Sequence, residues 1–193
     1  HKVVLEEYLM AVSAAGERMA RLDRQIETAV QGWRMKPAVE ALMAFRGMQV
    51  LTATVLVSEL GDMTRFNHPR PLMAFLGLVS SEHTSGSSRH QGSITKTGNS
   101  HARWFLVECA QHYALPPKVS KELSKRQEHQ PQRVKEISWK AQLRLNKKFW
   151  RLMQRGLLRQ KAVVAVAREL VGFIWVMMKE VQPRCLEPQK TES

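Results

Sequence analysis

A serine followed by a glycine stands in the polar stretch EHTSGSSRHQGSITKTGNS, which separates two apolar segments. Ser85 offers a hydroxyl, and the glycine after it leaves the backbone free to approach a ligand closely. Arg89, Lys96 and Arg103 supply positive charge around that hydroxyl. Such a hydroxyl can attack a phosphodiester while the cations stabilise the added charge of the transition state. The pattern therefore predicts a phosphate site with Ser85 as a candidate nucleophile.

The end of the polar stretch predicts the start of a helix. Asn99, in the turn sequence Gly-Asn-Ser, is suited to cap a helix that runs through residues 102–113. The free backbone amides at the start of that helix would point back toward the polar stretch. Asn99 is therefore a candidate contact to a bound anion, beside the cations named above.

Other interpretations of the same stretch stay open. A polar segment rich in serine and glycine is most often a flexible surface connection. A P-loop is excluded, because the interval from Gly86 to Gly92 is wrong and no Lys-Ser/Thr pair follows. The nearby histidines are His83, His90 and His101. Neither their spacing nor an acidic partner indicates a metal site or a Ser-His pair. Cys109 and His112 form half a zinc motif and are expected on a packed helix, so no metal site is predicted.

A second basic element follows later in the chain. Five cations recur at helical spacing and would share one face of a helix: Lys140, Arg144, Lys147, Arg151 and Arg155. The segment 133–161 holds ten Lys or Arg residues and one acidic residue, Glu136. Because a solvated helix normally mixes its signs, this face is predicted to contact a nucleic-acid backbone, with binding that weakens steeply as salt rises.

The elements that must position these residues are helical. Residues 1–33 carry apolar residues at alternating spacings of three and four, as in the seam of a coiled coil: Leu5, Tyr8, Val12, Ala15, Met19, Leu22, Ile26 and Ala29. This predicts one long helix that connects or dimerises the protein. Its seam needs a partner, which could be a second copy or a helix of a preceding N-terminal part. A homo-oligomer is expected.

The rest of the chain predicts an all-α domain over residues 37–181. Two apolar helices broken at Arg46-Gly47 resemble a helix-hairpin-helix, with a plain helical hairpin as the alternative. Residues 115–133 read as a flexible excursion, and 182–193 as a frayed tail. The apolar segment 163–181 is expected to be the buried central helix.

Composition limits the classes of partner. The chain has 193 residues with 30 Lys and Arg against 17 Asp and Glu, so its formal net charge is +13. This charge favours a polyanionic partner, with nucleic acid ahead of an anionic membrane. Two cysteines exclude a disulfide framework and a four-cysteine zinc site, and fit a reducing cytoplasm. Three charges interrupt the most apolar run, so no membrane span is expected.

Several blocks in order support a family comparison: GMQVLTATVLVSELGDMTRF, LMAFLGLVSSEHTSG, GSITKTGNSHARWFLVECA, RLNKKFWRLMQRG and VVAVARELVGFIW. Together they resemble the C-terminal domain of the DEDD transposases of bacterial insertion sequences, the bridge-RNA-guided recombinases. The resemblance runs from about residue 38 to 181. It implies a DNA transposase or recombinase domain that works with DNA and a guide RNA in the bacterial cytoplasm, near the nucleoid.

The resemblance also assigns roles to residues. Ser85 matches the family's serine nucleophile, which holds the cleaved strand as a phosphoserine ester. Lys96, Asn99 and Arg103 match positions that would contact that strand. Thr84 stands where many relatives have a second serine, so the neighbouring hydroxyls Ser87 and Ser88 remain alternatives.

Family members also carry an N-terminal RuvC-like domain with four acidic metal ligands, which implies Mg²⁺. This sequence holds no such set of carboxylates, so no cofactor is assigned to this chain itself. We expect the chain alone to be a piece of a longer protein that binds nucleic acid but cleaves poorly. Two alternatives stay open: a non-catalytic nucleic-acid-binding module, and a hydrolase that pairs Ser85 with a histidine.

Overall fold

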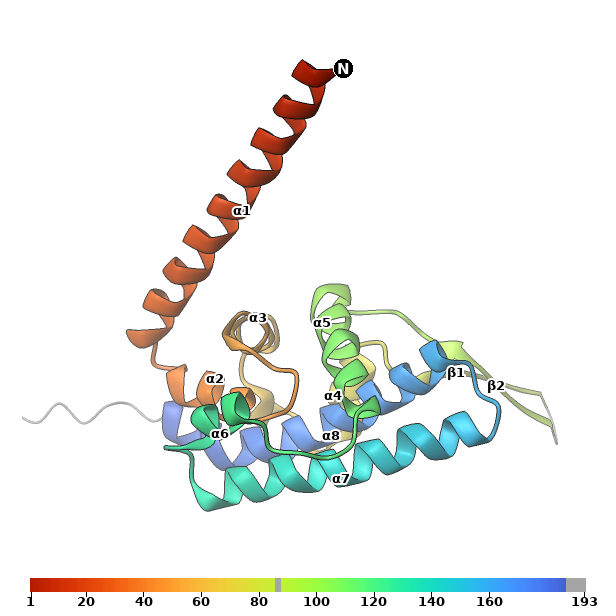
Figure 1. The fold of residues 1–193 in the computed structure, drawn as a ribbon. Coiled ribbons are helices and arrows are strands. Elements are labelled where there is room, and N and C mark those ends of the chain that lie inside the picture. The colour runs from red at the N-terminus through yellow and green to blue at the C-terminus, as the bar shows by residue number, and fades with distance from the viewer. Residues whose placement is uncertain (86–87, 187–193) are drawn as a thin grey trace, which may run out of the picture.

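Helix α1 (Lys2–Gln31) projects from the rest of the protein in this computed structural model, as Figure 1 shows. The structure describes residues 1–85 and 88–186, without the side chains of 82–91, 184 and 186. Thirty helical residues extend about 45 Å, and Gly32 caps the end of the helix. Val30 is the buried side chain of α1, whereas Tyr8 and Val12 of the seam are 69% and 70% exposed. The predicted long N-terminal helix is confirmed, and its seam faces solvent in the single chain.

Two long antiparallel helices, α7 and α8, form the base of the helical body (Figure 1). Helices α2, α4 and α5 pack against α8, while α3 and α6 contact α2. The helices of the body are α2 (Lys36–Met43), α3 (Val50–Leu60), α4 (Pro69–Phe75), α5 (Ser100–Gln111), α6 (Lys121–Gln127), α7 (Gln132–Gln154) and α8 (Arg159–Leu186). Short 3-10 turns lie at Met63–Arg65 and His112–Ala114. The predicted all-α domain is confirmed in its main features.

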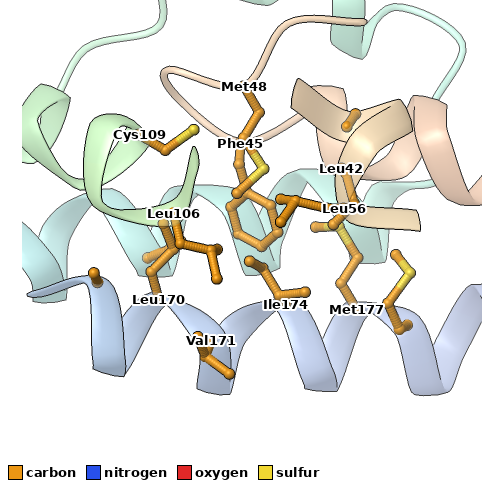
Figure 2. Close-up of a cluster of buried hydrophobic side chains, with 14 of the residues drawn as sticks. Leu42, Phe45, Met48, Leu56, Leu106, Cys109, Leu170, Val171, Ile174 and Met177 are labelled. Atoms are coloured by element: carbon orange, nitrogen blue, oxygen red, sulfur yellow. The ribbon is translucent and has the colours of Figure 1, made fainter. Parts of the chain in front are cut away.

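The core lies where α8 meets the shorter helices. Leu170, Ile174 and Met177 of α8 point toward Leu106, Phe45 and Leu56, respectively (Figure 2). All six side chains are fully or almost fully buried. Helix α8 is therefore the central element that the apolar run predicts. It extends five residues beyond Val181, because Gln182 is buried, accepts from the Met63 amide at 2.8 Å and donates to the Gly61 carbonyl at 2.9 Å.

The polar stretch forms a β-hairpin instead of the irregular active-site loop expected in an all-α domain. Strand β1 (Ser80–Ser85) pairs antiparallel with β2 (Ser88–Ile94). The hairpin projects from the end of the body at which α7 turns into α8, and α1 joins the other end (Figure 1). Backbone hydrogen bonds continue the pairing at its base, where the Thr95 amide donates to the Val79 carbonyl at 2.9 Å.

The chain leaving the hairpin passes tightly over the end of α4. The amides of Lys96 and Asn99 donate to the carbonyls of Gly77 and Phe75, at 3.1 and 3.2 Å. Gly77 and Gly98 have φ values of +63° and +79°, which favour glycine. A Cβ on Gly98 would lie 2.0 Å from the Phe75 carbonyl oxygen. This close crossing attaches the hairpin rigidly to α4 and α5.

The segment 115–133, expected to be a flexible excursion, contains helix α6 and the start of α7. Leu123 is buried, and the buried Gln127 donates to the Ala44 carbonyl at 2.9 Å. Ser138 donates to the same carbonyl at 2.6 Å. The segment thus differs from the expectation, because its Gln127, together with Ser138 of α7, satisfies the buried carbonyl that follows α2.

Among the described residues, no helix is long and apolar enough to cross a membrane.

Candidate active site and nucleic-acid interface

The structure places Ser85 at the end of β1, where its backbone pairs with Ser88. Arg89, on β2, pairs with Thr84. The side chains of Ser85 and Arg89, the predicted nucleophile and its neighbouring cation, lie outside the described part of the structure. The hairpin therefore carries both residues away from the helical body, and their chemical roles stay predictions.

The other predicted contacts of this stretch lie at the base of the hairpin, about 17 Å along β1 from Ser85 at the usual strand rise. Asn99 caps α5, with its Oδ1 accepting from the Ala102 amide at 2.8 Å. Arg103 donates through Nη1 to the carbonyls of Leu76 and Thr97, at 2.9 and 3.3 Å. Lys96 is exposed and has a φ of +56°. In this structure Asn99 and Arg103 fasten the hairpin base, and Lys96 remains available to a ligand.

Glu59, at the end of α3, organises the start of α5. Its carboxylate accepts from Asn99 Nδ2 at 2.7 Å and lies 2.9 Å from His101 Nδ1. These two side-chain hydrogen bonds lower the pKa of Glu59 below its usual value. Glu59 therefore ties α3 to the segment that follows the hairpin.

The predicted basic face is present, because all five of its cations are exposed: Lys140, Arg144, Lys147 and Arg151 on α7, and Arg155 directly after its last residue. Arg144 differs from the others, since its Nε hydrogen-bonds to Glu169 on α8. That bond raises the pKa of Arg144. Helix α7 runs along the base of the body toward the end that carries the hairpin (Figure 1). A linear array of exposed cations on one rigid helix is suited to a polyphosphate backbone.

An apolar stripe lies beside the basic face on α7. Trp139, Leu143 and Trp150 are 41%, 47% and 49% exposed. The indole of Trp150 donates to the Ala114 carbonyl at 3.0 Å, which orients its ring. Exposed aromatic rings beside cations are the combination on which unpaired bases stack in single-stranded nucleic-acid sites.

A groove of about 970 Å³ lies at the base of the hairpin. Two of its cations, Arg70 on α4 and Arg168 on α8, were not singled out as site residues by sequence analysis. No local spacing connects them, because they are about one hundred residues apart and meet only when α4 packs on α8. In the sequence they are recognisable only as basic residues. Their place beside the polar stretch becomes visible in the fold.

The two helices predicted around Arg46-Gly47 are present, in agreement with both a helix-hairpin-helix and a plain helical hairpin. Helices α2 and α3 flank the Arg46-Gly47 turn, and Gly47 has a φ of +78°. Arg46 donates through Nη1 to the carbonyls of Leu115 and Pro116, at 3.2 and 2.7 Å. The turn therefore has a packing role, and phosphate binding there stays a prediction.

The half zinc motif lies on a packed helix, as expected. Cys109 is buried on α5, and its thiol donates to the Gly47 carbonyl at 3.3 Å. Burial raises the pKa of Cys109 to about 12, which disfavours the thiolate that a metal needs. His112 is exposed at the end of the helix. Over the ranges that the structure describes, no group of three or more His, Cys, Asp or Glu side chains is placed to hold a metal ion.

Part of this sequence matches the model of a known protein family. Residues 39–124, from α2 through the hairpin to α6, match the model of the transposase IS116/IS110/IS902 family. This part of the chain is therefore similar to a domain of that transposase family. The matched range includes Ser85 and the crossing that fastens the hairpin, but ends before the basic face of α7.

Similar curated proteins have transposase names. "Putative transposase y4qE" of Sinorhizobium fredii is 41% identical over 165 residues, which cover 83% of this chain and 42% of that protein. The transposase for insertion sequence element IS1533 of Leptospira borgpetersenii is 27% identical over 144 residues, covering 74% of this chain and 42% of the relative. The chain thus spans about two fifths of the length of these relatives.

Proposed function

We propose that this chain is the DNA-joining domain of a bacterial insertion-sequence transposase, with Ser85 as its nucleophile. The observation that carries the proposal is the family match over residues 39–124, which contains the polar hairpin. The hairpin supports it physically, since it holds a serine at the end of a strand that projects beyond the helical body. There a hydroxyl can reach a DNA strand without displacing the core.

The chemistry is a transfer of one phosphoester bond. The Ser85 oxygen attacks the phosphorus, and a serine phosphoester forms as the bond to the leaving strand oxygen breaks. The hydroxyl proton ends on that leaving oxygen. A hydroxyl of the incoming strand then reverses the steps, so the bond is exchanged between strands and is never lost to water. Cations and backbone donors near the phosphate stabilise its added charge.

DNA is the proposed substrate, with a guide RNA and a second copy of the chain as partners. The net charge of +13 and the exposed face of α7 support nucleic-acid binding. The exposed seam of α1 supports pairing with another copy. The Mg²⁺ implied by the resemblance belongs to the RuvC-like domain, whereas the described residues of this chain hold no group of three or more potential metal ligands. We therefore assign no step of this chain to a metal.

The nucleophile is tested by substitution in a longer protein, with the RuvC-like domain that the resemblance implies placed ahead of this chain. Ser85→Ala is expected to lower strand exchange between two plasmids by at least a thousandfold, because no other group replaces the nucleophile. Ser88→Ala is the matched control and should keep activity within a few fold. If Ser85→Ala retains exchange and Ser88→Ala loses it, the nucleophile is assigned wrongly.

The basic face predicts a salt-dependent affinity. Lys147→Glu with Arg151→Glu should weaken binding of the chain to duplex DNA by about tenfold or more. It should also reduce the slope of log affinity against log salt by about two, because each lost phosphate contact removes about one unit. Fluorescence anisotropy at several salt concentrations measures both quantities.

A matched charge reversal separates this effect from net charge. Lys121→Glu with Lys125→Glu removes the same charge from exposed positions on α6, at the other end of the body. This pair should leave affinity and slope almost unchanged. Equal losses in both double variants would mean that the α7 face is not the binding surface.

A non-catalytic nucleic-acid-binding module is the second candidate. The geometry of the α2–α3 turn and the α7 face would support it without any nucleophile. Retained DNA binding together with a complete absence of strand exchange in the longer protein would favour this candidate.

A further inference from the structure

The groove at the base of the hairpin is a surface feature that the proposed nucleophile does not explain. It lies between the start of α4, the base of the two strands, and the turn from α7 to α8. Its volume of about 970 Å³ lies at the upper end of the range for small-molecule sites. A site of this size can hold one nucleotide together with parts of its neighbours.

The floor of the groove is apolar. Five hydrophobic side chains from α4, the hairpin, the α7–α8 turn and α8 line it: Met73, Leu78, Ile94, Leu157 and Val164. All of them except Leu78 are only partly buried, so their apolar surface remains accessible. An apolar floor of this kind gains free energy when it covers the face of a flat ring.

The rim of the groove is basic. Its cations are Arg70, Lys96, Lys148, Lys161 and Arg168. Glu169 is the one acidic residue among the described residues of the lining, and it is already engaged. Lys148 Nζ lies 2.8 Å from its carboxylate, and Arg144 also hydrogen-bonds to it. These two bonds lower the pKa of Glu169 although burial opposes them. The remaining rim charge therefore favours an anionic ligand.

We propose that this groove binds an unstacked nucleotide of the single DNA strand on which Ser85 acts. The base would lie on the apolar floor, and its flanking phosphates would meet the rim cations. A paired duplex does not fit this chemistry, because its base faces are covered by stacking. The inference rests on the proposed function and adds to it the form of the substrate: DNA that is unpaired next to the site of attack.

The groove adjoins the hairpin, so that one DNA strand can contact both. Ser80 and Ile94 line the groove and pair with each other at the base of the strands. Ser85 lies five residues further along β1, about 17 Å away. A strand that leaves the groove can follow the hairpin for that distance, so the same DNA can reach both places.

The test compares two single-stranded probes of equal charge, a 12-mer of thymidine and a 12-mer abasic backbone. Ala165→Trp fills the groove from α8, where Ala165 lines it and is half-buried. This variant is expected to lower affinity for the thymidine probe at least fivefold and to keep affinity for the abasic probe within twofold. One stacked base is worth about fivefold or more, which sets the scale.

Charge reversal at the rim gives a different result. Lys161→Glu with Arg168→Glu should lower affinity for both probes at least tenfold, because phosphates are common to both. The control pair Lys121→Glu with Lys125→Glu should leave both within twofold. Ala165→Leu is a milder filling variant if the tryptophan variant fails to melt cooperatively, and it should lower thymidine binding in the same direction.

If Ala165→Trp and Ala165→Leu each change the affinity for the thymidine probe and for the abasic probe by the same factor, the inference is overturned, since no base then enters the groove. A uridine 12-mer that binds tenfold more tightly than thymidine, with the same sensitivity to Ala165→Trp, would also overturn it and make the groove an RNA site. If strand exchange depends on Ser85 while every groove variant binds like the unmodified chain, only this inference fails. If the chain binds neither probe, the inference and the DNA-binding part of the proposed function both fail.

Discussion

Gly98→Ala is expected to destabilise the protein by about 3 kcal/mol or more, through two effects that act at one position. The φ of +79° is strained for a residue with a side chain. The added Cβ would also lie 2.0 Å from the Phe75 carbonyl oxygen, which is backbone and cannot rotate away. The crossing must open to relieve that contact, so the hairpin should lose its fixed position on α4 and α5.

Gly156→Ala is the matched control for this prediction. Gly156 has a φ of +76°, close to that of Gly98, but a Cβ there meets nothing within 4 Å. This variant should lower the free energy of unfolding only by the backbone strain, about 1 to 2 kcal/mol. Urea unfolding followed by circular dichroism measures both differences. A Gly98→Ala variant no less stable than Gly156→Ala would mean that the crossing is not tight.

Val12→Glu with Met19→Glu is expected to convert an oligomer of the chain to a monomer at micromolar concentration. Both residues lie in the exposed seam of α1, at 70% and 66% exposure, and are seven residues apart. In a coiled coil they would become buried, and a charge buried without a partner costs several kcal/mol. The dissociation constant should therefore rise by more than a hundredfold.

The control places the same charges with the same spacing on the other side of α1. Ser13→Glu with Ala20→Glu changes residues that lie about 100° around the helix from Val12 and Met19, by the helical period. This pair should leave the oligomer intact. Sedimentation equilibrium distinguishes the two results, and a monomeric unmodified chain at 100 micromolar would contradict the prediction directly.

Most of the helices could be predicted because apolar periodicity is a local property of the chain. The seam of α1, the turn at Gly47 and the apolar run of α8 each predict an element that the structure contains. Helix α6 was missed because its stability is not local. Gln127 and Ser138 are polar in sequence, and they become core residues only because both donate to the Ala44 carbonyl.

The hairpin was missed for a related reason. Its strands contain serines, histidines and charged residues, with little of the β-branched and aromatic content typical of strands. Pairing is set at the base, by backbone bonds at Val79 and Thr95 and by the close crossing at Gly98. Side-chain composition does not predict these backbone contacts, and so it does not predict the hairpin.

The candidate site could be predicted in part. The exposed cations of α7 follow from helical spacing alone. Asn99 and Arg103 were predicted as ligand contacts, but the structure uses both for hydrogen bonds within the fold. The groove required the packing of α4 and the hairpin on α8, which brings Arg70 and Arg168 to one surface.

The central claim, that Ser85 becomes joined to DNA, is tested most directly by mass spectrometry of a trapped protein-DNA adduct. The longer protein is mixed with a nicked DNA substrate that cannot be rejoined, denatured, and digested with nuclease and trypsin. We predict a nucleotide mass on the tryptic peptide that ends at Arg89, located by fragmentation at Ser85 and absent from Ser85→Ala. A nucleotide on another residue, or an adduct that persists in Ser85→Ala, would contradict the account.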